Sequence, residues 1–502
     1  MHRFGLAAMA ALTASFVALW AGAAVAATPA CAALTALQLP HAKVTAASDE
    51  TAGPITACKI EVTAAPTPDS DIRIEVWIPD GAAWNGRYLQ LGNGGFAGQI
   101  PSRSLQAAAS AGYAAAGTDD GHEATGTDAS WAVGHPEKVV DFGWRALKET
   151  TDAAKALIRA YQGGPARYAY FTGCSDGGRE GLIEAQRFPD DFDGIVAGAP
   201  AYDFSGLFTL AAYDEQALAK PGAYLTPASL QALQAGALAA CAGGAPYIAD
   251  QAGCRFDPAE VACPPGQVRA DCLAPAQVGA ARTIQAGVRA PGFTYPGNAP
   301  GAQAGPEGWE GWITGTSAEH ISSALIFQFA TAFWAEMVFG DPRVDIRQLD
   351  LAKAPAAAAA VSKIVDATDP DLSRFRAHGG KLIQWHGWND PAIPAAGSIV
   401  YYENVRRRMG DVDDFYRLYL TPGVLHCRGG PGPSVAPWLD ALQAWVEQGQ
   451  APGPLTATAS TRPAGPPPTI ASQVLCPYPA RPDGDRCITV EIERPPPPPP
   501  SR

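Results

Sequence analysis

The stretch Tyr168-Ala-Tyr-Phe-Thr-Gly-Cys-Ser-Asp-Gly-Gly-Arg-Glu-Gly-Leu182 decides the fold that this 502-residue chain predicts. Aromatic and strand-favouring residues open it, and a helix-like run that ends near Phe188 follows its glycines. A strand, a sharp turn and a helix are the context in which Gly173-Cys-Ser-Asp-Gly177 forms a nucleophile elbow. Because glycine carries no Cβ, strand and helix can approach closely around Ser175. The alternative is a glycine-rich surface turn with an incidental serine, since the motif also occurs by chance.

Composition limits the classes of function. Hydrophobic residues make up 47% of the chain, so a sizeable core is available. The length suits one large α/β domain with an insertion, or two to three ordinary domains. The formal net charge of -13 argues against nucleic acid or an anionic membrane as a partner. The acidity instead suits a soluble exported protein.

The N-terminus has the pattern of an export signal. The polar pair His2-Arg3 precedes an apolar run from Phe4 to about Trp20, and Ala24-Val-Ala26 fits a cleavage site. We predict a signal peptide over residues 1–27 and a secreted or periplasmic mature chain without a membrane partner. The alternative is a membrane anchor, but the apolar run is short and ends in small residues.

Strand and helix patterns alternate along much of the chain, which implies a mainly parallel sheet. Besides the opening stretch, strand patterns, some with their following loop, lie at residues 71–79, 86–91, 112–118, 192–200, 380–390 and 415–420. Helix patterns lie at residues 141–161, 354–360, 396–409 and 436–450. Asp141 is the expected N-cap of the first of these helices. Residues 28–70 are expected to be loop-rich.

The alternation stops near Tyr202. Residues 203–375 carry four cysteines, many Ala, Gly and Pro turns and an aromatic stretch from Leu325 to Trp334. We predict that this segment is an inserted lid domain. The catalytic domain would then consist of residues 28–202 and 376–490, followed by a disordered proline-rich tail at 491–502.

Three residues in loops after predicted strands have the order of a catalytic triad. Ser175, Asp390 and His426 follow the order nucleophile, acid, histidine of the α/β-hydrolases. His426 would take the proton of Ser175 and return it to the leaving alcohol, while Asp390 would hold the correct imidazole tautomer. The predicted fold class is therefore α/β, with an α/β-hydrolase core and an inserted lid.

The glycine-rich segment Gly92-Asn-Gly-Gly-Phe-Ala-Gly98 follows an early predicted strand. At this place α/β-hydrolases have the loop that supplies the second N–H group of the oxyanion hole. We predict that the backbone N–H groups of Asp176 and of Gly94 or Gly95 bind the oxyanion. The alternative is a loop whose glycines serve only flexibility.

Other titratable residues near strand ends compete for these roles, namely Asp119, Asp120, His122, His378 and His386. The aspartate pair precedes the nucleophile in the sequence, which is the wrong order for a triad acid. His386 lies too close to Asp390 for a separate triad strand, so we expect it to line the loop or to satisfy local hydrogen bonds.

All ten cysteines follow the N-terminal segment, and an even number in an exported chain is typical of disulfides. The chain has no C-x-x-C pair and no zinc-finger spacing of cysteines with histidines, so a metal cluster is not expected. Cys31 and Cys58 form a predicted local bridge. Cys476 and Cys487 are expected to tie down the C-terminal end.

Two cysteines flank the proposed catalytic residues. Cys174 directly precedes Ser175, and Cys427 directly follows His426. We predict a bridge between them, because it would hold the serine and histidine loops together. The alternative is two buried free thiols.

At these motifs the chain resembles the tannase and feruloyl esterase family, which also includes esterases of terephthalate monoesters. The resemblance covers about residues 30–490, and its specific part is the pairing of Cys174-Ser175 with His426-Cys427. The motifs that carry it are Gly92–Gly98, Thr118-Asp-Asp-Gly-His122, Gly173-Cys-Ser-Asp-Gly-Gly178, Phe192-Asp-Gly-Ile-Val-Ala-Gly-Ala-Pro200, His386-Gly-Trp-Asn-Asp390, His426-Cys-Arg-Gly-Gly-Pro-Gly432 and Cys476-Pro-Tyr-Pro479.

The resemblance implies a serine esterase with this triad, a bridge at the active site and a lid that sets specificity. It implies hydrolysis of aromatic acid esters, of the feruloyl or galloyl kind, through an acyl-enzyme. Alternatives are a general carboxylesterase for other small esters and a non-catalytic binding protein on a hydrolase scaffold. The resemblance also implies the local bridges Cys31–Cys58, Cys241–Cys254, Cys263–Cys272 and Cys476–Cys487.

The chain departs from the family at one place. The family often has a calcium loop in the lid, with several aspartates just after the first lid cysteine, because hard cations need clustered oxygen ligands. The corresponding segment, residues 241–254, keeps only Asp250. We expect that this calcium site is lost or badly weakened, and we expect no cofactor.

Overall fold

The structure is a computed structural model that describes residues 1, 30–267, 269–290, 293–459, 470–484 and 486–488. The predicted tail and, apart from Met1, the predicted signal peptide lie outside these residues. No helix among the described residues has the length and apolar character to cross a membrane.

A ten-stranded sheet runs through the molecule in the order β1-β2-β3-β4-β6-β5-β7-β8-β11-β12. The pairs from β1 to β6 are antiparallel, and those from β6 through β5 to β12 are parallel. This confirms the predicted α/β class with its parallel core. The strands are β1 (Gln38–Leu39), β2 (Ala42–Ala52), β3 (Ile55–Ala64), β4 (Ile72–Pro79), β5 (Arg87–Leu91), β6 (Ala114–Thr118), β7 (Tyr168–Cys174), β8 (Gly194–Gly198), β11 (Lys381–Gly387) and β12 (Tyr416–Thr421).

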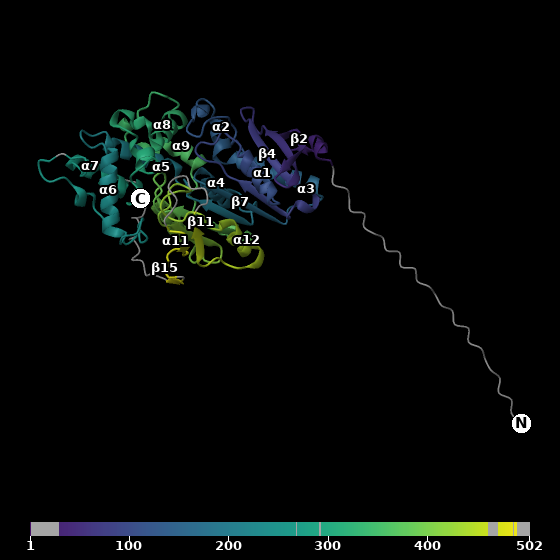
Figure 1. Ribbon diagram of the computed structural model, residues 1–502. Coiled ribbons are helices and arrows are strands. Elements are labelled where there is room, and N and C mark those ends of the chain that lie inside the picture. Colours follow the sequence, from purple (N-terminus) through teal and green to yellow (C-terminus); the bar gives the residue numbers. More distant parts are fainter. Residues whose placement is uncertain (2–29, 268, 291–292, 460–469, 485, 489–502) are drawn as a thin grey trace.

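Helices cover both faces of the sheet (Figure 1). The first face packs against α1 (Ser102–Ser110) and α12 (Trp438–Gln448), and the second against α3 (Ala146–Gln162), α4 (Asp176–Arg187) and α11 (Ala395–Met409). β6 and β8 are covered on both faces and are buried along their whole length. Their sequences are therefore nearly continuous apolar runs without alternation.

The prediction of a loop-rich N-terminal segment is wrong. β2 and β3 form a long hairpin, paired from Ala42 with Ala64 to Ala52 with Ile55. Most side chains of β2 are exposed, and they are short or polar. The alternation of apolar and polar residues that marks a strand is therefore weak in this part of the sequence.

Asp141 is not a helix N-cap, contrary to the prediction. The helical segment already begins with α2 (Pro136–Val140) and passes through Asp141 into α3. The buried Asp141 carboxylate instead accepts hydrogen bonds from the side chains of Ser70 and Arg145. The sequence also marks a helix start at Pro136, because proline is favourable in the first turn of a helix. The helical segment begins there and not at Asp141.

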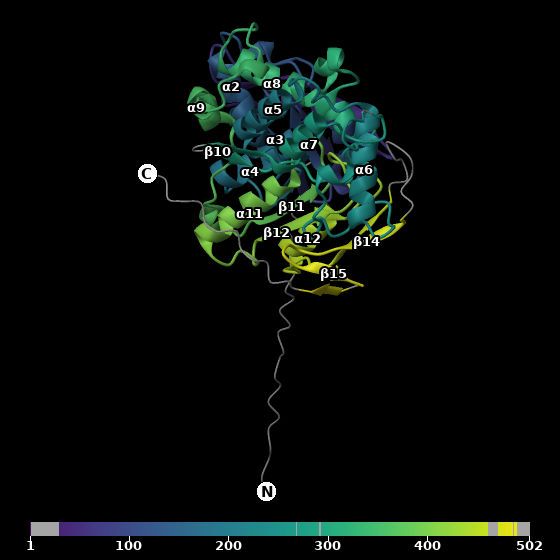
Figure 2. The ribbon, with the colours of Figure 1, turned by 90° about the vertical axis from the view of Figure 1, so that its left-hand side faces the viewer.

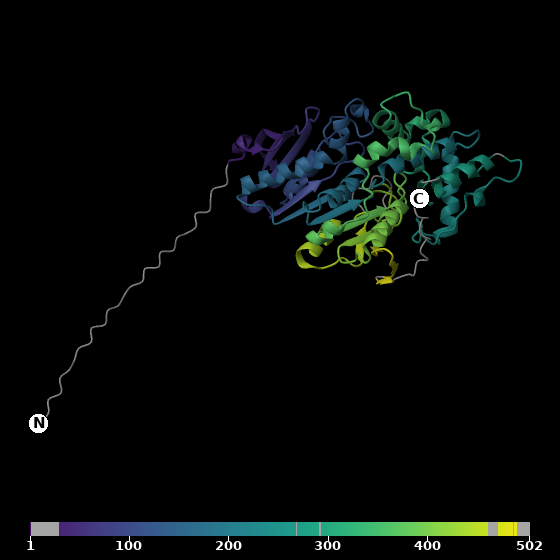
Figure 3. The same cartoon turned by 180° about the vertical axis from the view of Figure 1, so that it is seen from behind.

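The segment between β8 and β11 forms a helical body at one side of the sheet, where the lid was predicted. In Figure 2 this body faces the viewer. Figure 3 shows the molecule from behind, with the body on the right and the sheet on the left. α10 (Ser373–His378) packs on α4 and leads into β11, so residue 375, the predicted end of the lid, falls within a helix. The other elements are α5 (Phe204–Leu218), α6 (Pro227–Cys241), α7 (Pro275–Ala286), β9 (Val288–Ala290), β10 (Phe293–Tyr295), α8 (Leu325–Ala332) and α9 (Ala354–Val365).

Two small hairpins follow α12 near the C-terminus. The first pairs β13 (Leu455–Thr458) with β14 (Ser472–Leu475), and the second pairs β15 (Arg481–Asp483) with β16 (Arg486–Ile488). The first hairpin adds Ala457 and Leu475 to the apolar core beneath α12.

One ring ties the glycine-rich loop to the helical body. Phe96 is fully buried, although the residues on both sides of it in the sequence belong to a glycine-rich loop. Its ring centroid lies 5.8 Å from that of Phe204, 5.9 Å from that of Phe208 and 5.5 Å from that of Phe329. Such aromatic clusters bury large apolar areas, so the loop after β5 and the helical body share one core.

We expect Phe96→Ala to lower the free energy of unfolding by about 3–5 kcal/mol, because it removes a buried ring and leaves a cavity. Urea unfolding of the purified protein measures this change. Phe339→Ala is the control, since Phe339 is 46% exposed, and it should cost less than about 1 kcal/mol. Equal effects of the two variants would contradict the shared core.

Candidate active site

Ser175 lies at the turn between β7 and α4 with φ 68° and ψ −120°, a backbone conformation that is strained for a residue with a side chain. The two motif glycines make this turn possible. A Cβ on Gly173 would lie 2.4 Å from the Gly177 carbonyl oxygen, and a Cβ on Gly177 would lie 2.7 Å from the Asn93 carbonyl oxygen. Both distances are too short for a carbon atom, so the elbow requires glycine at both positions.

The structure brings Ser175, His426 and Asp390 into one hydrogen-bonded chain. His426 Nε2 lies 2.9 Å from Ser175 Oγ, and His426 Nδ1 lies 2.8 Å from Asp390 Oδ2. The three residues come from the loops that follow β7, β12 and β11. Catalytic groups collect at this carboxyl edge in open α/β sheets.

Asp390 is completely buried, accepts three hydrogen bonds and lies close to a fourth donor, His386. Its Oδ1 accepts from the N–H groups of Ala392 and Ile393 at 2.8 and 2.9 Å, and its Oδ2 faces His426 and, at 3.3 Å, His386. Burial alone would raise the pKa of Asp390, but the charge of His426 and the hydrogen bonds from both histidines hold it well below its usual range. The carboxylate therefore stays ionised beside His426.

His386 is a buried hydrogen-bonding partner, as the sequence led us to expect. Its Nδ1 lies 2.7 Å from Ser398 Oγ, and its Nε2 lies 2.9 Å from the Ile393 carbonyl oxygen. A carbonyl oxygen only accepts, so Nε2 carries the hydrogen and also faces Asp390. His386 thus helps to orient the acid.

The other histidines weighed from the sequence lie in different surroundings. His122 Nε2 lies 2.7 Å from the carbonyl oxygen of Phe96, and the imidazole stacks on Trp131 at 3.8 Å between centroids. His378 lies 3.7 Å from Asp190 at the surface. Neither histidine contacts Ser175 through any hydrogen bond of the described residues.

The glycine-rich loop after β5 lies against the elbow. The Gly177 N–H donates to the Asn93 carbonyl oxygen at 2.8 Å. The N–H groups of Gly94 and Gly95 have no acceptor among the described residues. Asp176 is the first residue of α4, where helix N–H groups lack an acceptor within the helix. The three N–H groups predicted for the oxyanion hole are therefore not used by the described protein.

All ten cysteines are paired in five disulfides. The bond between Cys174 and Cys427 joins residues 253 positions apart, with an S–S distance of 2.03 Å and a Cα–Cα distance of 6.0 Å. Each of these cysteines neighbours one end of the Ser175–His426 hydrogen bond, so the bridge holds the two loops together. The other disulfides are Cys31–Cys58, Cys241–Cys254, Cys263–Cys272 and Cys476–Cys487.

The helical body between β8 and β11 contacts the proposed catalytic histidine through Trp312. The indole lies edge-on to the His426 imidazole, with 4.9 Å between ring centroids. The sequence did not single out Trp312 as a site residue. In the sequence, Trp312 was marked only by lying near a second tryptophan, Trp309, in a glycine-rich part of the predicted lid. That signal does not separate the two residues, because Trp309 is a buried core residue.

These features define the class of protein. Three parallel strands of the sheet are each followed by one of the site residues: the serine elbow follows β7, the acid follows β11 and the histidine follows β12. This arrangement is that of an α/β-hydrolase. The family profile described as Tannase and feruloyl esterase matches residues 58–488.

Similar proteins agree with this profile. An uncharacterised esterase from Xanthomonas campestris pv. campestris is 38% identical over 90% of this chain and 88% of its own length. A "Probable feruloyl esterase" from Arthroderma benhamiae is 32% identical, over 85% of this chain and 83% of its own. The crystal structure of feruloyl esterase B from Aspergillus oryzae superposes with a TM-score of 0.81 at 27% identity, covering 90% of this chain and 95% of that one. The chain belongs to the tannase and feruloyl esterase family and is a carboxylic ester hydrolase.

We expect Asp390→Asn to lower kcat by about 10⁴-fold, because the amide would favour the wrong tautomer of His426. Steady-state hydrolysis of an ester by the purified variant measures the change. Asp369→Asn, at an exposed carboxylate, is the matched control and should leave kcat unaltered. If both variants kept wild-type kcat, a different group would have to orient His426.

Proposed function

We propose that this protein is an exported serine esterase that hydrolyses esters of aromatic acids, of the feruloyl or galloyl kind. Ser175 is the nucleophile, His426 the general base and acid, and Asp390 the orienting carboxylate. The observation that carries this proposal is the continuous hydrogen-bonded chain from Ser175 Oγ through both nitrogens of His426 to Asp390.

The first half of the reaction forms an acyl-enzyme. Ser175 Oγ attacks the ester carbonyl carbon while its proton passes to His426 Nε2. The carbonyl oxygen becomes an oxyanion, which accepts hydrogen bonds from the N–H groups of Asp176 and of Gly94 or Gly95. The intermediate then collapses, and His426 gives its proton to the departing alcohol.

The second half releases the acid. Water attacks the acyl carbon and gives a proton to His426 Nε2, and the same N–H groups hold the second oxyanion. Ser175 then leaves with the proton that His426 returns. Asp390 stabilises the imidazolium in both halves, and its low pKa keeps it ionised while it does so.

Two observations support an aromatic acyl group. The family profile is named for enzymes of tannins and feruloyl esters, and one relative is named as a feruloyl esterase. Within the chain, Trp312 places an indole beside His426, where a planar ring of the substrate can pack against it. A general carboxylesterase for other small esters is the second candidate, since fold and triad do not determine the substrate.

Export is supported by the cysteines and by the N-terminal sequence. Disulfides persist in oxidising compartments, and this chain has five of them with no free thiol. We propose a secreted or periplasmic location on this basis.

The rates of hydrolysis of methyl ferulate, methyl gallate and a short-chain aliphatic ester test the substrate class. We expect the mature protein to cleave an aromatic ester with the highest kcat/KM, and Ser175→Ala to lose at least about 10³-fold. Ser104→Ala, at an exposed serine of α1, is the control. Cleavage of only the aliphatic ester would keep the triad but refute the aromatic specificity, whereas an active Ser175→Ala would refute the triad.

We also propose that the calcium loop of the family does not bind calcium here. Asp250 is the single carboxylate of the Cys241–Cys254 loop. Its Oδ1 accepts from the Gly253 N–H, and its Oδ2 pairs with Arg481 at 2.8 Å. One paired carboxylate beside a cation does not meet the ligand requirement of Ca²⁺.

We expect neither calcium nor a chelator to change the Tm of the protein, and we expect no stoichiometric calcium by elemental analysis. A tightly bound calcium ion that disappears in the Asp250→Ala variant would contradict this proposal.

A further inference from the structure

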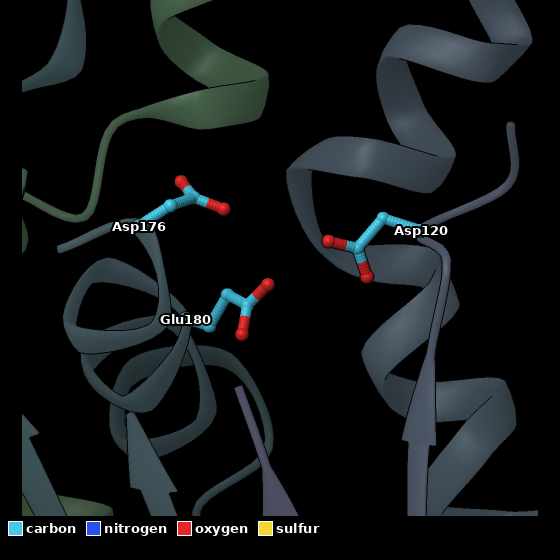
Figure 4. A group of neighbouring side chains, drawn as sticks. All are labelled: Asp120, Asp176 and Glu180. Atoms are coloured by element: carbon cyan, nitrogen blue, oxygen red, sulfur yellow. The ribbon is translucent and has the colours of Figure 1, made fainter. Parts of the chain in front are cut away.

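Three buried carboxyl groups lie directly beneath the proposed oxyanion loop. Asp176 and Glu180 belong to α4, and Asp120 belongs to the loop after β6, as Figure 4 shows. Each is at most 1% exposed, and one oxygen of each lies within 4.8 Å of the others. The proposed triad uses none of the three side chains.

The group binds Asn93, which directly precedes Gly94. The Asn93 N–H donates to Glu180 Oε2 at 2.9 Å. The Asn93 amide donates to Asp120 Oδ2 at 3.0 Å and to the Thr118 carbonyl oxygen at 2.8 Å. Both the backbone and the side chain of Asn93 are therefore held by this group.

The orientation of Asn93 determines where the next N–H group points. The Asn93 carbonyl accepts from the Gly177 N–H at the start of α4. In a planar trans peptide the C=O and the following N–H point in opposite directions. The contacts of Asn93 thus set the direction of the Gly94 N–H, which is free among the described residues.

One cation and one proton reduce the charge of the three carboxyl groups to a single negative charge, which lies on Asp120. The guanidinium of Arg179 bonds to both oxygens of Asp176. Glu180 Oε1 and Asp120 Oδ1 are buried and have no hydrogen-bond partner among the described residues, so two ionised carboxylates here would be unsatisfied, whereas a proton between the two groups would satisfy both oxygens. Burial and the charges of Asp120 and Asp176 raise the pKa of Glu180 well above its usual range, so Glu180 carries this proton.

We infer that Glu180 is a positioning residue of the esterase: as a neutral acid it accepts from the Asn93 N–H, donates to Asp120, and so aims the Gly94 N–H at the oxyanion. This role rests on the proposed function of Ser175 and the oxyanion loop. A group that positions an oxyanion donor acts mainly on the transition state and little on the binding of the ester.

Two substitutions of similar volume separate this role from a merely structural one. Glu180→Gln retains one acceptor and one donor, so we expect kcat to stay close to that of the wild type. Glu180→Met removes both hydrogen bonds and leaves the Asn93 N–H unpaired. We expect it to lower kcat by about 10²-fold with little change in KM, which is the loss expected for one oxyanion donor.

Glu184→Met is the matched control. Glu184 lies one turn further along α4 and is also fully buried, but it makes no hydrogen bond to the loop after β5 among the described residues. We expect its kcat to match the wild type, whatever the change in Tm. Asn93→Ala tests the same contact from the loop and should also lower kcat.

The outcomes distinguish this inference from the proposed function. An active Ser175→Ala would refute the triad itself. If Ser175→Ala is inactive but Glu180→Met keeps the kcat of Glu184→Met, only the role of Glu180 is refuted. A Gln variant as slow as the Met variant would likewise overturn it, because the amide preserves the hydrogen bonds. Circular dichroism of each variant verifies that it folds, and Asn93→Ala replaces Glu180→Met if that variant does not.

Discussion

The close approach of α4 to β7 and to the loop after β5 is the constraint on which the rest of the site depends. Only glycines at positions 173 and 177 permit it, because a Cβ at either position would overlap a carbonyl oxygen. The approach holds Ser175 in its unusual backbone conformation and places the first N–H groups of α4 beside the glycine-rich loop. One pair of glycines therefore positions both the proposed nucleophile and the proposed oxyanion donors.

The buried carboxyl groups on the two sides of Ser175 are stabilised in different ways. Asp390 receives three hydrogen bonds and remains ionised, which suits a group that must stabilise an imidazolium. On the other side, Asp176 pairs with Arg179, while burial raises the pKa of Glu180 well above its usual range, so that Glu180 is neutral beside Asp120. The ionised Asp390 thus lies beside His426, where the proposed reaction develops positive charge.

The helical body between β8 and β11 contacts the proposed site directly. Phe96 extends from the glycine-rich loop into the aromatic core of this body, and Trp312 extends from it to His426. The disulfide between Cys174 and Cys427 adds a covalent link at the same edge of the sheet. Changes in the helical body can therefore alter both the surroundings of His426 and the alignment of the proposed oxyanion donors.

The sequence by itself determined the α/β class, the nucleophile elbow and the order of Ser175, Asp390 and His426, because each depends on local patterns of strand, turn and helix. It did not reveal the β2–β3 hairpin, whose exposed side chains carry little apolar alternation. Only the tertiary structure decided that Trp312 meets His426 and that Glu180 and Asp120 hold Asn93. These contacts join segments far apart in the chain, so no local pattern of residues encodes them, and the raised pKa of Glu180 arises only when burial removes the water around it.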